Sequence, residues 1–159
     1  MERINQFIGR TIPWCTLGMV LVTFVIVVLR YAFERGWVWM QEIVIYLHAF
    51  TFLLTAGYAL ARDEHVRVDI LYRPASPRRK AWINLLGSVF LLMPMCAVLF
   101  YHSYPYVIAS WSVLEGSKDG GGLEAVFLLK TAIPIFSLLL FAQALATIRQ
   151  CISTLRNNS

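Results

Sequence analysis

The chain has 159 residues, of which 58% are hydrophobic and only 14% are charged, and its formal net charge is +5. About a quarter of the residues of a typical soluble domain are charged, so this composition excludes an ordinary soluble domain. The sequence contains no phosphate-binding loop, metal-ligand spacing or catalytic motif. We therefore expect no enzymatic activity, no cofactor and no nucleic-acid partner.

Four long apolar stretches follow one another along the chain. A bilayer core of roughly 30 Å requires about 20 helical residues to cross it. The stretches show no alternation of polar and apolar residues, as a transmembrane β-strand would. We predict a single all-α integral membrane domain, residues 1–159, with four transmembrane helices at residues 12–33, 38–61, 81–108 and 125–148.

The first apolar stretch is longer than the core of a signal peptide, and no typical cleavage site follows it, so we expect it to be a retained span. Before it, Ile4, Phe7, Ile8 and Ile12 recur at helical spacing, with polar residues on another face. This pattern predicts a short N-terminal helix lying in the membrane interface. A frayed tail is the alternative.

The distribution of the bases predicts the orientation of the chain. Ten of the 14 Lys and Arg residues lie in the N-terminal tail, in residues 62–80 or after the last span, and four lie near the other ends of the spans. Cytoplasmic segments are enriched in Lys and Arg. We therefore expect both termini and the 62–80 loop to be cytoplasmic, and the 109–124 loop to be periplasmic.

The cytoplasmic loop carries the candidate residues Arg62, His65, Arg67 and Asp69. No nucleophile or metal-ligand pattern accompanies them, so a catalytic role is weakly supported. We interpret the loop as a solvated anchor, in which Arg67 and Asp69 can pair. The "SPRRKAW" that follows predicts a helix start, with Ser76 as the N-cap and Pro77 in the first turn. Its three bases are suited to the anionic surface of the membrane lipids.

Two ionisable residues are placed within the membrane by these spans. Glu42 lies one turn into the second span and Lys130 one to two turns into the fourth, both from the outer side. Intramembrane ionisable residues are functional candidates by default. We expect the two to pair at the outer end of a helix bundle. Snorkelling of each to the head groups and an ion relay are the alternatives.

Two histidines and two packing signals lie elsewhere in the spans. His48 and His102 fall at similar depth on different helices, where they are suited either to ligate a b-type haem or to form interhelical hydrogen bonds. Pro94 predicts a kink near the middle of the third span. Gly57 and Ala61 form a small-x-x-x-small pair that favours close helix approach.

Three sequence blocks resemble the small membrane subunit of TRAP (tripartite ATP-independent periplasmic) transporters, the DctQ-type family. "RDEHVRVDILYRPASPRRKAWINLLGSVFLLMP" is similar to the junction of that family's second and third spans. "WVWMQEIVIYL", which includes Glu42, is similar to the start of its second span, and "GGGLEAVFLLKTAIPIFSLLLFAQALA" to its fourth. The pair Glu124-Ala125 departs from the family, where a proline and a basic or aromatic residue are expected.

The resemblance implies a subunit of a sodium-driven symporter for organic acids or related solutes in the bacterial inner membrane. Its implied partners are a large multi-span membrane subunit, which moves the solute, and a periplasmic binding protein, which captures it. The small subunit is then a static scaffold, and the outer loop is a candidate for docking the binding protein. The alternatives are an autonomous dimeric antiporter that uses Glu42 as its coupling acid, and a b-haem membrane anchor.

Overall fold

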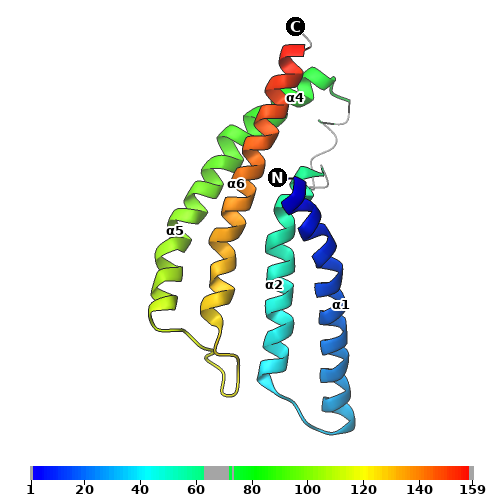
Figure 1. Ribbon diagram of the computed structural model, residues 1–159, viewed down its shortest axis with the longest axis vertical. Coiled ribbons are helices and arrows are strands. Elements are labelled where there is room, and N and C mark those ends of the chain that lie inside the picture. Colours follow the sequence, from blue (N-terminus) through cyan, green and yellow to red (C-terminus); the bar gives the residue numbers. More distant parts are fainter. Residues whose placement is uncertain (1, 63–71, 73, 158–159) are drawn as a thin grey trace.

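The computed structural model describes the backbone of residues 2–62, 72 and 74–157, and the side chains of these residues except 2–8, 10 and 157. All regular structure in this part of the chain is helical (Figure 1). The helices are α1 (Glu2–Ala32), α2 (Val38–Ala61), α4 (Pro77–Gly87), α5 (Met93–Ser112) and α6 (Val126–Asn157), and a π-helical turn, η1 (Ser88–Leu92), joins α4 to α5. Four helical segments, with α4, η1 and α5 as one, are long and apolar enough to cross a membrane.

The four long segments form a single layer, in the order α5, α6, α2, α1 (Figure 1). The main helix–helix interfaces join α1 to α2, α2 to α6, and α6 to α4, η1 and α5. The arrangement therefore differs from the bundle expected from the sequence, because α1 and α5 lie at opposite edges instead of closing a core. A layer one helix thick leaves two broad faces uncovered.

The seam between α2 and α6 depends on a glycine. Gly57 is buried, and a Cβ atom placed on it would lie 3.6 Å from both the Cβ and the carbonyl oxygen of Leu139. Close backbone approach of this kind is typical of helix packing in membranes. On α6, Ala132, Ser137 and Ala144 are almost fully buried, so small side chains line the interfaces of the central helix.

The third span has the predicted N-cap, and a π-helical turn lies just before Pro94, where a kink was predicted. The Ser76 hydroxyl accepts a hydrogen bond from the backbone N–H of Arg79 at 3.4 Å, and Pro77 is the first residue of α4. Near the middle of the span, the N–H of Met93 donates to the carbonyl of Ser88, five residues back, instead of four. Pro94 has no N–H to donate and its ring crowds the preceding turn. The π-turn accommodates the proline, because it widens the helix without ending it.

The helices at the two ends of the chain extend well beyond the predicted spans. The N-terminal helix is not a separate element, because residues 2–32 form the one continuous helix α1, with Pro13 inside it. Whether its first turns lie in the membrane interface remains a prediction. At the other end, α6 continues nine residues beyond the predicted 125–148, to Asn157.

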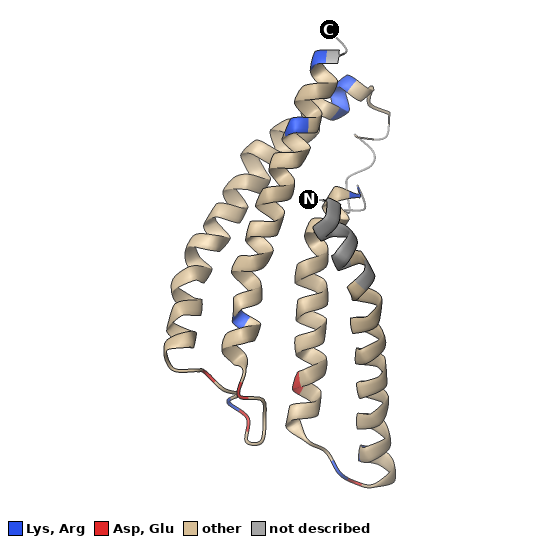
Figure 2. Cartoon of the chain, in the orientation of Figure 1, with Lys and Arg blue, Asp and Glu red and all other residues tan. Residues whose placement is uncertain are grey.

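Charge is distributed unequally between the two ends of the layer (Figure 2). Where α2 and α6 end and α4 begins, the described charged side chains are all bases: Arg62, Arg78, Arg79, Lys80, Arg149 and Arg156. We call this the basic end. The described acids lie at the opposite end, which we call the acidic end. The cytoplasmic assignment of the basic end remains a prediction.

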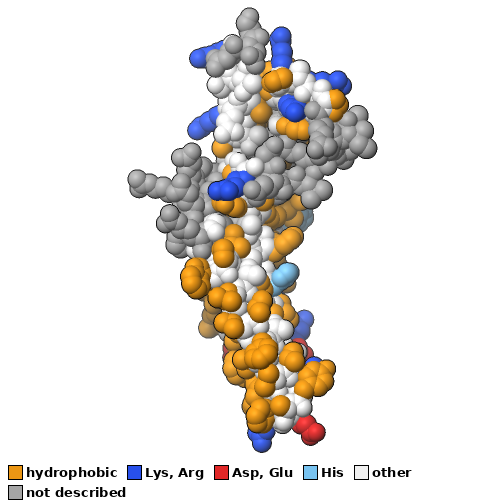
Figure 3. Space-filling model, turned by 90° about the vertical axis from the view of Figure 1, so that its right-hand side faces the viewer, with side chains coloured by type: hydrophobic (Ala, Val, Ile, Leu, Met, Phe, Trp, Pro, Cys, Tyr) orange, Lys and Arg blue, Asp and Glu red, His pale blue; other side chains and the backbone are white. Residues whose placement is uncertain are grey.

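The surface between the two ends is apolar. Large hydrophobic side chains are exposed along α1, among them Trp14 at 73%, Val20 at 59% and Phe24 at 65%. Figure 3, turned to face the α1 edge, shows hydrophobic side chains along most of the described length of the molecule. Such a surface is expected against lipid tails or against another membrane helix.

Candidate functional site

The polar contacts of the acidic end form two clusters on one loop, Glu42 with Ser117 and Leu123, and Lys130 with Glu115 and Ser110. Together we call them the rim network. It is built on the loop between α5 and α6, which folds back on itself. The N–H of Ser117 donates to the carbonyl of Leu123 at 2.9 Å, and the N–H of Gly122 donates to the carbonyl of Asp119 at 3.0 Å. Gly121 has a φ of 80°, in the left-handed region that favours glycine. The loop is therefore a hydrogen-bonded turn.

Glu42 ties this turn to α2. One oxygen of its carboxylate accepts a hydrogen bond from the hydroxyl of Ser117, and the other accepts one from the backbone N–H of Leu123 at 2.5 Å. Hydrogen bonds to an ionised carboxylate are shorter and stronger than neutral ones. Glu42 thus connects the α1–α2 half of the layer to the loop that belongs to the α5–α6 half.

Gly122 lies between the two groups that meet here. A Cβ atom at this position would be 2.4 Å from the Ser117 hydroxyl oxygen and 2.7 Å from Oε2 of Glu42. Gly120, two residues earlier, has open space around it. The carboxylate can approach the turn only because residue 122 has no side chain.

Lys130 is paired with Glu115, at the other end of the same turn. Its Nζ lies 2.5 Å from Oε2 of Glu115, and that oxygen also accepts a hydrogen bond from the Ser110 hydroxyl at 2.7 Å. The ammonium also lies 4.0 Å from the centroid of the Tyr106 ring, a cation–π distance. The hydrogen bonds from Lys130 and Ser110 lower the pKa of Glu115 below its ordinary value of 4.5.

An aromatic contact fixes the same ends of α5 and α6. The indole N–H of Trp111 donates to the Thr131 hydroxyl at 2.9 Å, and its ring meets Phe127 edge-on at a centroid distance of 4.7 Å. Tyr and Trp are enriched where a membrane protein meets the aqueous boundary. This contact lies beside the Lys130–Glu115 pair and holds the two helix ends together.

The predicted pairing of Glu42 with Lys130 is not what the structure shows. Lys130 is neutralised by Glu115, and Glu42 is held by a hydroxyl and a backbone N–H. The two residues do not contact each other, and the α5–α6 loop supplies the partner of each. Sequence reasoning named this loop as a candidate surface but did not assign Glu115 or Ser117 as partners. The sequence did contain one signal for these contacts, the run of glycines near Ser117, because glycines allow the loop backbone to approach another helix closely.

Among the candidate residues of the 62–80 loop, the structure describes Arg62, which lies away from this site. Arg62 caps α2 at the basic end, with its guanidinium 4.9 Å from the centroid of the Tyr58 ring. His65, Arg67 and Asp69, with the proposed Arg67–Asp69 pair, lie outside the described residues.

The two intramembrane histidines are on separate, exposed surfaces. His48 stacks on Phe52 of its own helix at 6.3 Å, and His102 meets the edge of Tyr101 at 5.4 Å. Their helices, α2 and α5, are separated in the layer by α6 (Figure 1). Within the described part of the chain, no three His, Cys, Asp or Glu residues are grouped to hold a metal ion.

The chain matches the family model described as tripartite ATP-independent periplasmic transporters, DctQ component, over residues 19–154. It belongs to this family. A DctQ-family relative is named "C4-dicarboxylate TRAP transporter small permease protein DctQ", from Vibrio cholerae serotype O1. It is 29% identical over 95 residues, which are 60% of this chain and 38% of the relative's length. The DctQ match includes the whole rim network and at least part of each of the four helical segments.

For a DctQ-family protein, the network has the chemistry of a structural joint. Each carboxylate is satisfied by donors from a neighbouring element, and the described residues form no nucleophile–base pair within it. The arrangement can hold the two halves of the layer in register at the acidic end.

Proposed function

We propose that this chain is the small membrane subunit of a TRAP transporter and acts as a static scaffold for the large membrane subunit. The transporter would import organic acids or related solutes across the bacterial inner membrane, driven by a sodium gradient. The chain itself would catalyse no reaction and bind no cofactor. Its DctQ-family membership and its shape together support this role.

The single layer of helices is the observation that carries the proposal. Almost fully buried apolar residues in the described chain are few and mostly small: Ala81, Cys96, Val107, Ala132, Leu140, Ala144 and Cys151. Helices in a membrane associate through close packing, because lipid tails are as apolar as the side chains. A layer with two apolar faces offers one broad surface to a membrane partner and the other to lipid.

The rim network is consistent with a subunit whose helices keep fixed positions relative to one another. It joins α2, the α5–α6 loop and α6 through charged hydrogen bonds, and so opposes sliding of one half of the layer past the other. In the predicted orientation it also presents residues 113–125 on the periplasmic side. We include in the proposal that this turn contributes to docking of the periplasmic binding protein.

Co-purification tests the scaffold role. The chain should be expressed with a large TRAP membrane subunit from the same organism, extracted in mild detergent, and purified by a tag on the chain. We expect a stable complex of the two. If the chain is well folded but never retains the large subunit, the scaffold proposal fails.

The two rival functions make different predictions. An autonomous antiporter should transport when reconstituted alone and lose activity on Glu42→Gln, whereas we expect no transport by the chain alone. The position of Glu42 favours our proposal, because its carboxylate is occupied by two donors in the second turn of α2. A b-haem anchor should show a Soret band after purification.

A further inference from the structure

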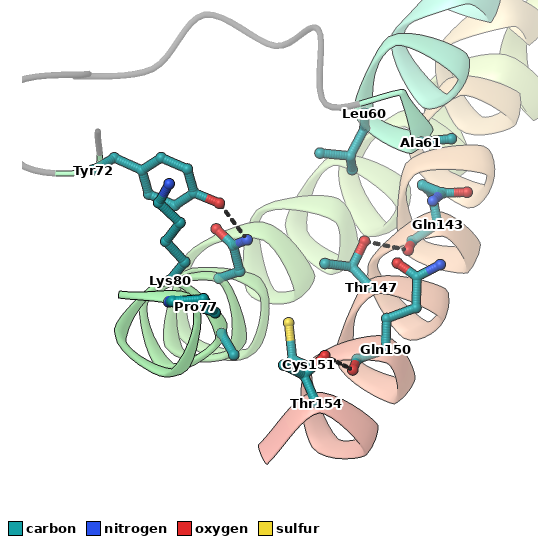
Figure 4. Close-up of a pocket in the computed structure, with 12 residues that line it drawn as sticks. Leu60, Ala61, Tyr72, Pro77, Lys80, Gln143, Thr147, Gln150, Cys151 and Thr154 are labelled. Carbon is teal, nitrogen blue, oxygen red and sulfur yellow. Dashed lines mark hydrogen bonds between the residues drawn. The ribbon is translucent and has the colours of Figure 1, made fainter. Parts of the chain in front are cut away.

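A cavity opens at the basic end, between α4, α6 and the last turn of α2 (Figure 4). Its volume is about 300 Å³, at the lower end of the range of small-ligand sites. Twelve described residues line it, and most of them are polar. The cavity is remote from the rim network, and neither the fold nor the scaffold role requires it.

The α6 wall of the cavity is a polar stripe on an otherwise apolar helix. Gln143, Thr147, Gln150 and Thr154 recur at helical spacing and all face the cavity. Gln143 is only 6% exposed, and its carboxamide forms no hydrogen bond with any described residue. Gln143 also lines the cavity, so its carboxamide offers a donor and an acceptor to water or to a polar ligand there.

The α4 wall supplies the charge. Lys80 lines the cavity, and its ammonium lies 5.2 Å from the centroid of the Tyr72 ring. Beside it, the amide nitrogen of Asn84 donates to the Tyr72 hydroxyl at 3.0 Å. Lys80 forms no ion pair with any described acid, because the described acids lie at the other end of the layer. A base with carboxamide donors around it fits an anionic group.

An apolar surface adjoins the polar cavity. On α4, Trp82, Ile83 and Leu86 are exposed at 48%, 41% and 48%. Ile83 follows Lys80 by three positions, so it lies beside Lys80 on the helix surface. An anionic ligand with an apolar tail can therefore place its charge in the cavity and its tail along α4. A free phosphate ion would leave this surface unused.

We propose that the cavity binds the head group of an anionic phospholipid, with Lys80 and Gln143 as its polar contacts. The phosphate lies by the ammonium, and the acyl chains run along the exposed residues of α4. This site is specific, in contrast to the diffuse attraction of Arg78 and Arg79 to the membrane surface. The proposal does not depend on the transport role.

Native mass spectrometry of the full chain tests this site, with any accompanying large subunit kept in place. The protein is purified in mild detergent and titrated with phosphatidylglycerol, and separately with phosphatidylcholine. We expect one tightly held phosphatidylglycerol per chain, bound more tightly than phosphatidylcholine. Lys80→Gln removes a hydrogen bond between two charged groups, so it should weaken binding about 10-fold or more.

Arg79→Gln is the matched control. Arg79 is the neighbouring base on the same turn of α4 but does not line the cavity, so this variant should keep the tight binding. Gln143→Leu, which leaves the charge unchanged, should also weaken it. Circular dichroism and size-exclusion chromatography verify that each variant is folded.

Three outcomes would overturn the proposal. If Lys80→Gln and Arg79→Gln weaken the binding of phosphatidylglycerol equally, the lipid is held only by general attraction to the basic surface. Equal affinity for the two lipids would exclude an anionic head-group site. Displacement of the bound lipid by millimolar inorganic phosphate would assign the cavity to free phosphate.

Discussion

The carboxylate of Glu42 and the hydroxyl of Ser117 are hydrogen-bonded across a separation of 75 positions in the chain. Together with the bond from the Leu123 N–H, this contact is where α2 meets the α5–α6 loop. It joins the two halves of the layer at the acidic end, as Gly57 does further along α2. The Glu42–Ser117 contact and the helix packing at Gly57 can be tested separately.

Removing the Ser117 hydroxyl should loosen the acidic end. Ser117→Ala leaves the Glu42 carboxylate with one of its two donors, so we expect a lower midpoint of thermal unfolding in detergent. Ser112→Ala is the control, because among the described residues the Ser112 hydroxyl bonds to the Ala109 carbonyl of its own helix alone. Equal midpoints for the two variants would contradict a structural role for the Glu42 contact.

A methyl group at residue 122 should be more damaging than one at residue 120. Gly122→Ala forces a Cβ atom against the Ser117 hydroxyl and the Glu42 carboxylate, whereas Gly120→Ala meets open space. Overpacking costs typically about 1–3 kcal/mol, and we expect a loss of that order for Gly122→Ala alone. Unfolding in a denaturing detergent measures the difference. If Gly122→Ala left the free energy of unfolding unchanged, Glu42 would not hold the turn.

Charge reversal should identify the partner of Lys130. The single changes Glu115→Lys and Lys130→Glu each place two like charges together, and the double swap restores an opposite pair. We expect the double variant to give more monodisperse protein than either single one. The corresponding Glu42/Lys130 swap should give no such recovery, because those residues do not pair. Recovery in the second swap only would refute the observed pairing.

The contribution of Glu115 to stability should be lost in acid. Its pKa in the folded protein is lowered from 4.5, so its stabilising effect is fully present above pH 4.5. It falls as the pH drops through the lowered pKa, where the carboxylate is protonated. Glu115→Gln should therefore be less stable than the original chain at pH 6–8, and the difference should narrow below about pH 4.5. A difference that does not change with pH would exclude the titration of Glu115 as its source.

The central seam should tolerate a small side chain but not a large one. A Cβ atom on Gly57 lies at ordinary contact distance from Leu139, so Gly57→Ala should change stability little. Gly57→Leu has no room, and we expect a loss of about 1–3 kcal/mol. Gly87→Leu is the size-matched control, because a Cβ at Gly87 meets nothing within 4 Å. Equal effects at the two glycines would argue against close α2–α6 packing.

Several features were predictable because they depend on local chemistry. The four apolar stretches are long enough to span a bilayer whatever their neighbours are, and the structure contains four helices of that kind. The cap at Ser76 and the irregularity before Pro94 also follow from single residues and their backbone groups. The DctQ resemblance, confirmed by the family match, came from the order of residues within such stretches.

The partners of Glu42 and Lys130 within the rim network were harder to predict from the sequence. Glu42 and Lys130 were recognised from their predicted depth in the membrane, and their opposite charges near the same side suggested a pair. The depth of two residues in the membrane does not show whether side chains of another segment lie between them and bind each one. The glycines of the α5–α6 loop allow the turn to approach Glu42, and this turn supplies Ser117 and Leu123 as donors.

By itself, the sequence determined the number of apolar helices, the segregation of the bases and the family, because each depends on composition or order along the chain. Only the tertiary structure decided that the helices form a layer, that Lys130 pairs with Glu115, and that Lys80 and Gln143 share a cavity. Helices of similar apolar composition can pack in several arrangements in a membrane. The arrangement adopted depends on where small residues allow close approach, and those contacts join positions far apart in the chain.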